Sequence, residues 1–424
     1  MRFIASAMKR FLFSETMPPS EYQKSARARV AIIRCTSYER TLVEKAMQRG
    51  VDLLGGYGAF ARPGERILFK PNVLWGTDPA RCIVTHPEVL RAAVTGFLTT
   101  GAVLQYGDSS AGLPGATRAM SKCGYRKILA SFPVDAVSFD RGREVDYPAG
   151  IAGKHLRIAQ AALDADGIVN LPKLKTHGAV RMTGAVKNCY GCVPGLIKGQ
   201  YHARFPDPYD FSALLVDIAA FVHPRLHIMD AVEAMEGNGP QSGKPKKLGV
   251  LLLSTDPVAL DVAACRLIDL DPEYVPTIAA GVRSGLGIAD MGKIDFVGDH
   301  PATSIDRSFK AVRMPPLRMP TRGLLGEIKR FFLPRPVIRR KKCTRCGRCV
   351  AACPVEPRAL EQPDRKRKPV YNYRRCIRCY CCQEVCPSEA IIIRQTVTGV
   401  LMPFGPYFSL LISIIKRRLS RVKE

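Results

Sequence analysis

Nine of the fifteen cysteines lie between positions 343 and 386, in two runs with the same spacing. The runs read CTRCGRCVAACP at 343–354 and CIRCYCCQEVCP at 376–387, so each follows the pattern C-x2-C-x2-C-x3-C-P. Three thiolates spaced by two residues can wrap a small metal cluster in one loop, and the fourth must come from elsewhere. The chain is too long for a secreted disulfide scaffold, and zinc sites pair C-x2-C units without the triple run. The spacing therefore favours iron–sulfur clusters.

The segment at about 340–394 resembles the two-cluster ferredoxin domain of bacteria. In that family the fourth cysteine of each run binds the cluster of the other run. The resemblance implies two 4Fe–4S clusters that pass single electrons. One would be held by Cys343, Cys346, Cys349 and Cys386, and the other by Cys376, Cys379, Cys382 and Cys353. Cys381 lies outside the pattern and is predicted not to be a ligand.

Upstream of these cysteines, apolar runs rich in β-branched residues alternate with helical segments. Strands are predicted at 29–35, 66–72, 102–108, 134–139, 167–171, 225–230, 247–253 and 293–297, and helices at 41–54, 86–98, 210–222, 256–268 and 274–284. Continuous apolar strands separated by helices are typical of a mostly parallel sheet covered by helices on both faces. The predicted fold class is α/β, with a small α+β ferredoxin-like two-cluster domain at the C-terminus.

The predicted domain organisation has five parts. They are a loosely ordered lead (1–28), an α/β domain (29–300), a basic linker with a short helix (301–340), the two-cluster 4Fe–4S domain (341–395) and an amphipathic basic tail (396–424). In the tail, residues 407–423 have an apolar helical face and terminal cations. This pattern suits either peripheral contact with a membrane or docking on protein.

The positive charge is concentrated near the C-terminus. The whole chain has a formal charge of +27, and residues 301–424 carry 28 Lys and Arg against 8 Asp and Glu. Such a segment indicates an acidic partner or an anionic membrane face, and part of its charge offsets the clusters. No groove-reading motif accompanies the charge, so nucleic acid is not predicted. The first fifteen residues lack a signal-peptide core, which favours a cytoplasmic protein, with association at the inner membrane face as an option.

Several segments of the α/β part resemble the bacterial and archaeal domain-of-unknown-function family 362, which is often fused to a ferredoxin module. They are FKPNVL (69–74), GDSS (107–110), NLPKLKTH (170–177), GAVKNCYGCVPG (184–195), DAVEAMEGNGPQSG (230–243) and STDPVALD (254–261). The resemblance covers about 29–298. It implies little about chemistry, because the family is named for lacking an assigned function.

Cations that follow a predicted buried strand form the main candidate site. Ligands of open α/β sheets collect beyond the carboxyl ends of the strands. Such cations suit a carboxylate or phosphate, although solvated loop lysines are the alternative interpretation. The candidate catalytic residues are Lys173, Lys175, His177, Lys187 and, at the end of the strand at 225–230, Asp230. Lys70, Asn72, Asn188 and Asp108 to Ser110 also follow strands or lie close in sequence.

Two further motifs have an open interpretation. Gly237, Asn238 and Gly239 would let backbone amides approach a cofactor, or would form a simple turn. Cys189 and Cys192 form a C-x2-C that suits a redox dithiol, half of a metal site or two structural thiols. Candidate acid/base groups, or oxygen ligands for a hard cation, are Asp108, Asp230, Glu233, Glu236 and Asp256, of which Asp256, before Pro257, resembles a helix cap.

Three functions are compatible with these patterns. The leading hypothesis is an oxidoreductase in which the clusters relay electrons between an external redox carrier and a small anionic substrate or cofactor in the α/β domain. The second is a non-catalytic electron-transfer subunit of a redox complex. The third is a non-redox enzyme with structural clusters.

Overall fold

The computed structural model describes residues 27–74, 76–110, 116–195, 197–299, 305–318 and 333–394. Its larger domain is built on a ten-stranded sheet with the order β12-β1-β11-β10-β7-β2-β3-β4, and β8 pairs with β10 and β9. The strands of this sheet are β1 (Ala28–Arg34), β2 (Arg66–Pro71), β3 (Val103–Tyr106), β4 (Val134–Ala136), β7 (Gly167–Leu171), β8 (Lys173–His177), β9 (Arg181–Thr183), β10 (Leu226–Glu236), β11 (Lys244–Ser254) and β12 (Ile294–Gly298).

The predicted mostly parallel sheet is confirmed. Neighbours β12–β1, β10–β7, β7–β2, β2–β3, β3–β4 and β10–β8 run parallel. β11 runs antiparallel to β1 and β10, and β9 antiparallel to β8. The antiparallel direction of β11 was not predicted, because a fully buried strand has the same continuous apolar sequence in either direction. A separate hairpin is formed by β5 (Gly142–Asp146) and β6 (His155–Ala159).

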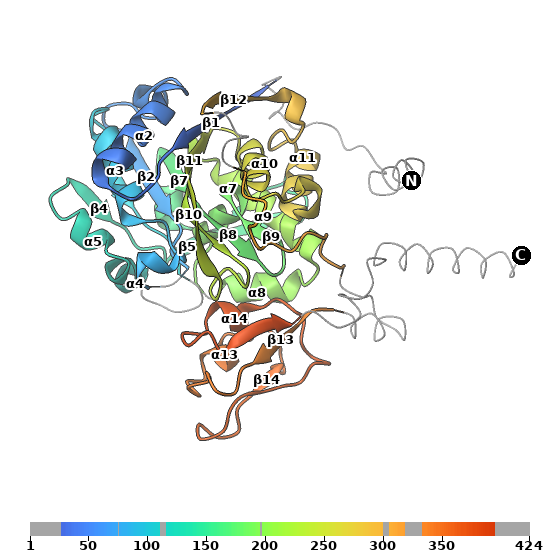
Figure 1. The fold of residues 1–424 in the computed structure, drawn as a ribbon. Coiled ribbons are helices and arrows are strands. Elements are labelled where there is room, and N and C mark those ends of the chain that lie inside the picture. The colour runs from blue at the N-terminus through green and yellow to red at the C-terminus, as the bar shows by residue number, and fades with distance from the viewer. Residues whose placement is uncertain are drawn as a thin grey trace, which may run out of the picture.

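Helices cover both faces of the sheet (Figure 1). One face carries α2 (Arg40–Asp52) and α3 (Pro87–Leu98), with α4 (Ala116–Lys122) and α5 (Tyr125–Ile128) nearby. The other carries α7 (Ala185–Asn188), α9 (Pro208–Val222), α10 (Pro257–Leu267) and α11 (Pro276–Ser284). The short helix α6 (Gln160–Leu163) follows β6.

Alternate residues of each central strand pack into two different cores. Ile32 and Leu68 belong to the core under α9 and α10, whereas Ile33 and Phe69 belong to the core under α2 and α3. Successive side chains of a strand point to opposite faces, so a strand buried on both sides must be apolar at every position. This requirement explains the continuous apolar runs in the sequence.

The C-terminal domain lies below the sheet edge, next to α8 (Ile197–Arg204) (Figure 1). It contains β13 (Arg335–Ile338), α13 (Arg348–Ala351), β14 (Leu360–Glu361), β15 (Val370–Tyr371), α14 (Cys381–Glu384) and β16 (Ile391–Arg394). β13 pairs with β16, and β14 with β15, both antiparallel. The predicted linker helix near 322–332 and the tail segment 407–423 lie outside the described residues.

We predict that Gly96→Ala destabilises the larger domain. A Cβ at Gly96 of α3 would lie 2.0 Å from Cζ of Tyr57, whose ring packs on Phe97 with 5.1 Å between centroids. Overpacking of this kind costs about 1–3 kcal/mol. Urea unfolding should show this loss for Gly96→Ala. Gly58→Ala is the control, because a Cβ there meets nothing within 4 Å. Equal stability of the two variants would contradict the packing argument.

Candidate functional site

A buried ion pair lies at the carboxyl ends of β2 and β3. Lys70 Nζ is 2.7 Å from Asp108 Oδ1, and both side chains are almost fully buried. Asp108 Oδ2 also accepts a hydrogen bond of 2.6 Å from Val73 N, which fixes the chain after β2. A Cβ at Gly191 would lie 2.0 Å from Asp108 Oδ1 and 2.4 Å from Lys70 Nζ. Glycine is therefore needed at position 191 for the chain to pass over the pair.

A second buried pair joins β8 to β10. Lys173 Nζ is 2.8 Å from Asp230 Oδ2 and donates a 2.7 Å hydrogen bond to the Tyr38 hydroxyl. The Tyr38 hydroxyl in turn donates to Asp230 Oδ1 at 2.8 Å, and His86 N donates to Asp230 Oδ2 at 2.9 Å. Two candidate residues of the sequence analysis, Lys173 and Asp230, are thus brought together and neutralise each other.

β8 is a strand and not the loop that the sequence analysis left open as an alternative. All five of its residues are buried, so its lysines are not solvated. Lys173, Lys175 and His177 are two residues apart and share one face of the strand. This face runs from Asp230 in the sheet toward the C-terminal domain.

Lys175 is buried without a carboxylate partner. Its Nζ donates to Asn72 Oδ1 and to the Ile83 carbonyl, both at 2.6 Å. Burial lowers the pKa of Lys175 to about 7, and the positive charge of Lys187 acts in the same direction. Lys175 therefore exchanges a proton near neutral pH, which few lysines do.

A chain of side-chain amides continues from Lys175 into the core. Asn72 Nδ2 donates to Asn188 Oδ1 at 2.9 Å, and Asn188 Nδ2 donates to Asn170 Oδ1 at 2.7 Å. Asn170 Nδ2 lies 2.9 Å from His227 Nδ1. Burial lowers the pKa of His227 to about 3, so the ring is neutral and Nδ1 accepts. The chain holds the amide oxygen of Asn72 toward Lys175.

The helix α7 carries Lys187 and Asn188 and is held by Asp261 of α10. Asp261 Oδ1 accepts from Ala185 N at 2.6 Å, and a Cβ at Gly184 would lie 2.0 Å from the same oxygen. Burial raises the pKa of Asp261 to about 7, against the effect of its backbone hydrogen bonds. The motifs at 184–195 and 254–261 therefore meet here.

Lys187 and Lys198 complete a lysine-rich centre with Lys70 and Lys175. Burial lowers the pKa of Lys187, although Glu384 and Cys381 of the C-terminal domain act against this. Lys187 Nζ lies 6.0 Å from the centroid of the Tyr190 ring, and no hydrogen-bond partner for it is found among the described residues. Lys198 Nζ donates to the Ser109 carbonyl, and burial lowers its pKa to about 8.

The C-x2-C cysteines lie under this centre, in the short 3-10 turn η3 (Cys189–Cys192). Neither residue is exposed. Burial raises the pKa of Cys192 to about 12 and that of Cys189 well above its usual value. Both groups are therefore neutral thiols in this structure. Cys189 Sγ donates a hydrogen bond to the Ala185 carbonyl at 3.5 Å.

The first cysteine run lines a small cavity in the C-terminal domain. Its lining includes Ile338, Ile391 and four cysteines: Cys343, Cys346, Cys349 and Cys386. Cys386, the last cysteine of the second run, thus lies with the first three of the first run. Cys386 Sγ accepts a hydrogen bond of 3.2 Å from Ala390 N. These donors fit a 4Fe–4S cluster, whose four irons each take one thiolate.

Three thiols of the second run, those of Cys376, Cys379 and Cys382, are also close enough to influence one another. Cys382 Sγ accepts from the Tyr371 hydroxyl at 3.2 Å, and Cys353 Sγ accepts from Ala359 N at 3.3 Å. Within the described ranges, no three His, Cys, Asp or Glu side chains are close enough to hold a single metal ion.

The second run also forms the contact with the larger domain. Glu384 Oε1 lies 3.1 Å from His177 Nε2. Burial lowers the pKa of His177 to about 4, and His177 Nδ1 accepts from Ala179 N at 3.1 Å, so Nε2 carries the proton and donates a hydrogen bond to Glu384 Oε1. Burial alone would raise the pKa of Glu384, but His177 and Lys187 hold it at about 2. An ionised carboxylate of the cysteine loop therefore faces the lysine-rich centre.

The predicted glycine-rich loop supports the same contact. Gln383 Nε2 donates to the Asn238 carbonyl at 3.0 Å, and Ile393 N donates to Asn238 Oδ1 at 3.3 Å. Gly239 N donates to Thr176 Oγ1 at 3.1 Å, and Gly237 N donates to the Lys310 carbonyl at 2.8 Å. These groups form hydrogen bonds with other residues of the same chain, so the loop positions the C-terminal domain.

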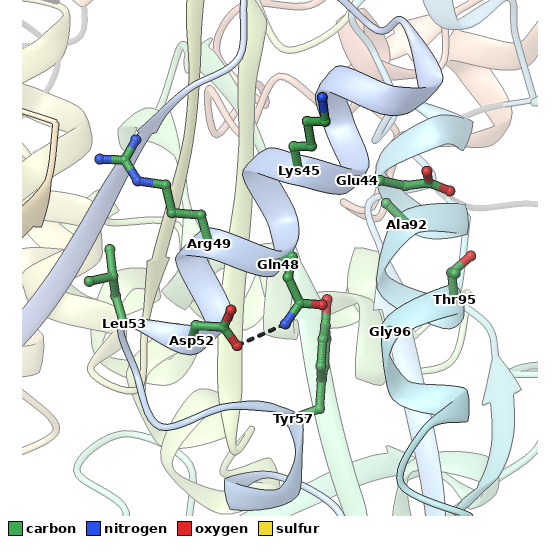
Figure 2. A pocket seen from close by; sticks show the side chains of 10 residues that line it. All are labelled: Glu44, Lys45, Gln48, Arg49, Asp52, Leu53, Tyr57, Ala92, Thr95 and Gly96. Atoms are coloured by element: carbon green, nitrogen blue, oxygen red, sulfur yellow. Dashed lines mark hydrogen bonds between the residues drawn. The ribbon is translucent and has the colours of Figure 1, made fainter.

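A groove lies elsewhere, between α2 and α3 (Figure 2). It has a volume of about 730 Å³, and along its α2 side Gln48 Nε2 donates to Asp52 Oδ1 at 2.8 Å. Glu44, Lys45 and Arg49 also line it. No candidate residue of the sequence analysis is among its lining residues.

These features define an α/β domain with a lysine-rich centre, of which Lys70 and Lys175 are fully buried, joined to a cysteine domain suited to 4Fe–4S clusters. Residues 67–266 match the family model "Domain of unknown function (DUF362)", and residues 335–387 match the "4Fe-4S dicluster domain". The thylakoid-associated protein sll1697 of Synechocystis sp. is 36% identical over 311 residues, which cover 72% of this chain and 94% of that protein. The chain belongs to the DUF362 family and is an iron–sulfur protein.

Two solved structures share a distant likeness in fold. The lactate racemase apoprotein of Thermoanaerobacterium thermosaccharolyticum aligns with a TM-score of 0.37 and 12% identity, over 58% of this chain and 59% of that one. A Thermotoga maritima protein aligns with a TM-score of 0.36 and 11% identity, over 55% of this chain and 60% of that one. In the described part of the chain, no helix has the length and apolar character needed to cross a membrane.

We predict that wild-type stability, relative to Lys175→Met, rises with pH above 7. Lys175 has a folded-state pKa of about 7, and an unfolded lysine has about 10.4. Between these values the unfolded chain binds the extra proton, so raising the pH favours folding by up to about 1.4 kcal/mol per pH unit. Below pH 7 the Lys175 ammonium group is charged in both the folded and the unfolded chain, so the full free-energy cost of burying that charge remains. Urea unfolding of both proteins from pH 6 to 10 measures this difference.

The control is Lys127→Met, because Lys127 is exposed. Its unfolding free energy should follow that of the wild type across the whole pH range. If the Lys175→Met and wild-type curves were parallel, Lys175 would not have the lowered pKa.

Proposed function

We propose that this protein is a redox enzyme in which two 4Fe–4S clusters exchange electrons with a small anionic substrate or cofactor at the lysine-rich centre. Cys343, Cys346, Cys349 and Cys386 would hold the first-run cluster, and Cys376, Cys379, Cys382 and Cys353 the second-run cluster. The clusters supply single electrons. The residues of the larger domain bind the anion, exclude water and, at Lys175, hold or release a proton.

One observation carries this proposal: the second cysteine run forms a wall of the lysine-rich centre. Glu384, two residues after Cys382, bonds His177, and Cys381 and Glu384 both act on Lys187. An electron donor held by this run would lie next to any anion bound by Lys187. Since Lys70 is already paired with Asp108, Lys187 and Lys175 supply the positive charge that an anion would neutralise.

The cluster content predicts the iron content. Protein purified without oxygen should contain about eight irons per chain. Cys376→Ala removes one thiolate of the second-run cluster and should lower this number toward four, because a cluster with three thiolates is labile. Cys381→Ala is the matched control from the same loop and should keep all the iron. Iron loss in Cys381→Ala, or none in Cys376→Ala, would contradict the ligand assignment.

The anion site predicts that Lys187→Gln weakens anion binding about tenfold or more, because hydrogen bonds to charged groups contribute about 1.5–3 kcal/mol. Inorganic phosphate, acetate and malonate serve as probes. Their binding is measured by the change that each produces in the EPR spectrum and midpoint potential of the reduced protein.

The control for this experiment is Lys127→Gln, an exposed lysine of α5. It should respond to the probes like the wild type. An anion response that is unchanged in Lys187→Gln would exclude Lys187 from the site. If none of the probes produced a response in the wild type at pH values below the pKa of Lys175, the proposed anion site would be wrong.

A second candidate function is an electron-transfer subunit without a substrate. The observation that favours it is the internal pairing of the buried lysines: Lys70 with Asp108, and Lys173 with Asp230. In this case the larger domain serves only to dock a redox complex. Stable association with a partner protein, together with unchanged spectra in the presence of all three anions, would favour this function.

The C-terminal domain suggests where the protein works. Residues 333–394 carry sixteen Lys and Arg against five Asp and Glu. A positive surface of this kind suits an acidic redox carrier or an anionic membrane. The relative from Synechocystis is called thylakoid-associated, and we propose a cytoplasmic protein that contacts a membrane peripherally. The segment 407–423, the predicted contact, lies outside the described residues.

A further inference from the structure

The two cysteine runs are repeats of each other, so corresponding positions can be compared directly. Arg345 and Arg378 occupy the same place, one residue before the second cysteine of each run. Ile338 and Tyr371 likewise both stand five residues before the first cysteine. At both places the two halves of the domain differ in ways that act on the charge of a cluster.

The two arginines have different surroundings. Arg345 is exposed, and its Nη1 donates to the Lys366 carbonyl at 3.0 Å. Arg378 is only 9% exposed and lies over the Tyr373 ring, 5.2 Å from its centroid. Its Nε and Nη1 are buried without a hydrogen-bond partner. Buried donors of this kind need an acceptor, and the sulfurs of a bound cluster would supply one.

Arg378 lies two residues after Cys376, a proposed ligand of the second-run cluster, and its guanidinium is close enough to act on that sulfur. The guanidinium is always charged and sits away from water, so its charge is weakly screened. The charge of Arg345, in contrast, is surrounded by solvent.

The second difference is a hydroxyl group. The Tyr371 hydroxyl donates to Cys382 Sγ at 3.2 Å, whereas the corresponding Ile338 has no donor. One cysteine of each proposed ligand set accepts a backbone hydrogen bond: Cys353 Sγ from Ala359 N at 3.3 Å and Cys386 Sγ from Ala390 N at 3.2 Å. The second-run cluster therefore has an additional donor.

A cation of the larger domain also lies near the second run, because Lys187 is close enough to Cys381 and Glu384 to interact with both. Glu384 acts in the opposite direction, but its carboxylate pairs with His177, with 3.1 Å between Oε1 and Nε2. Water near the exposed Cys346 also stabilises added charge on the first-run cluster. The buried guanidinium of Arg378 acts through a lower dielectric constant than water, so its charge is screened less than a charge in solvent.

We propose that Arg378 and Tyr371 give the second-run cluster the higher reduction potential, so that electrons from an external redox carrier enter near Cys346 and pass inward to the lysine-rich centre. Positive charge and hydrogen bonds to sulfur favour the reduced state of a cluster, because reduction adds one negative charge. The internal step moves one electron from the first-run to the second-run cluster. It breaks no bond and transfers no proton. This inference rests on the proposed pair of clusters and adds the direction of electron flow.

The test is an EPR-monitored redox titration of the whole protein. Cys346→Ser assigns the two couples, because it changes a ligand of the first-run cluster alone. We expect Cys346→Ser to perturb the couple with the lower midpoint potential. Arg378→Gln should lower the midpoint of the other couple, and the corresponding variant Arg345→Gln should shift either couple less than this.

Tyr371→Phe removes one oxygen atom, so it still tests the inference if Arg378→Gln does not fold. It should also lower the higher midpoint, at unchanged iron content. The inference is overturned if Cys346→Ser perturbs the higher couple, or if Tyr371→Phe and Arg378→Gln leave both midpoints in place. Absence of two reducible couples would instead refute the proposed function. If both couples are present but the anion probes produce no response, the proposed substrate site is refuted and the inferred direction of electron flow is not.

Discussion

Lysine side chains enter the core of the larger domain from β2 and β8, where water cannot solvate their charge. Lys70, Lys173 and Lys175 are at most 1% exposed. Burying an ammonium group without a partner costs several kcal/mol, so each needs a carboxylate, a set of carbonyl oxygens or a lowered pKa. Asp108 and Asp230 supply the first solution, and Lys175 uses the other two.

This constraint explains several sequence motifs that are far apart in the chain. Gly191 is required because the turn after Cys189 crosses the Lys70–Asp108 pair without room for a Cβ. Asn72 and Asn188 are required because Lys175 needs an amide oxygen held in a fixed direction. These residues are conspicuous in the sequence, yet they bind one another. Their first role is to hold a set of charges in a dry site.

The C-terminal domain takes part in the same balance. Glu384 brings a negative charge to the lysine-rich centre, and Gln383 and Asn238 fix its position. The second cysteine run makes this contact through Glu384 and Gln383. The cysteine loop and the lysine-rich centre therefore depend on each other for charge compensation. This dependence gives a physical reason for the fusion of the two domains in one chain.

The sequence alone determined the local features. Apolar runs marked the strands β1, β2, β7 and β10, because a strand buried on both faces has to be apolar throughout. Cysteine spacing indicated the 4Fe–4S type, because a cluster of fixed size demands fixed spacing. Asp256 was recognised as a helix cap because capping involves neighbours in the chain: its Oδ1 accepts from Val258 N at 2.8 Å.

Only the tertiary structure decided which residues meet. Lys173 and Asp230 are 57 residues apart, and His177 and Glu384 are 207 apart. No sequence pattern links such residues, since their contact depends on the order of strands in the sheet and on the docking of the second domain. The burial of Arg378 and the exposure of Arg345 are equally invisible in two cysteine runs with the same spacing. Burial sets how strongly a charge interacts with its neighbours, and burial is a property of the folded chain.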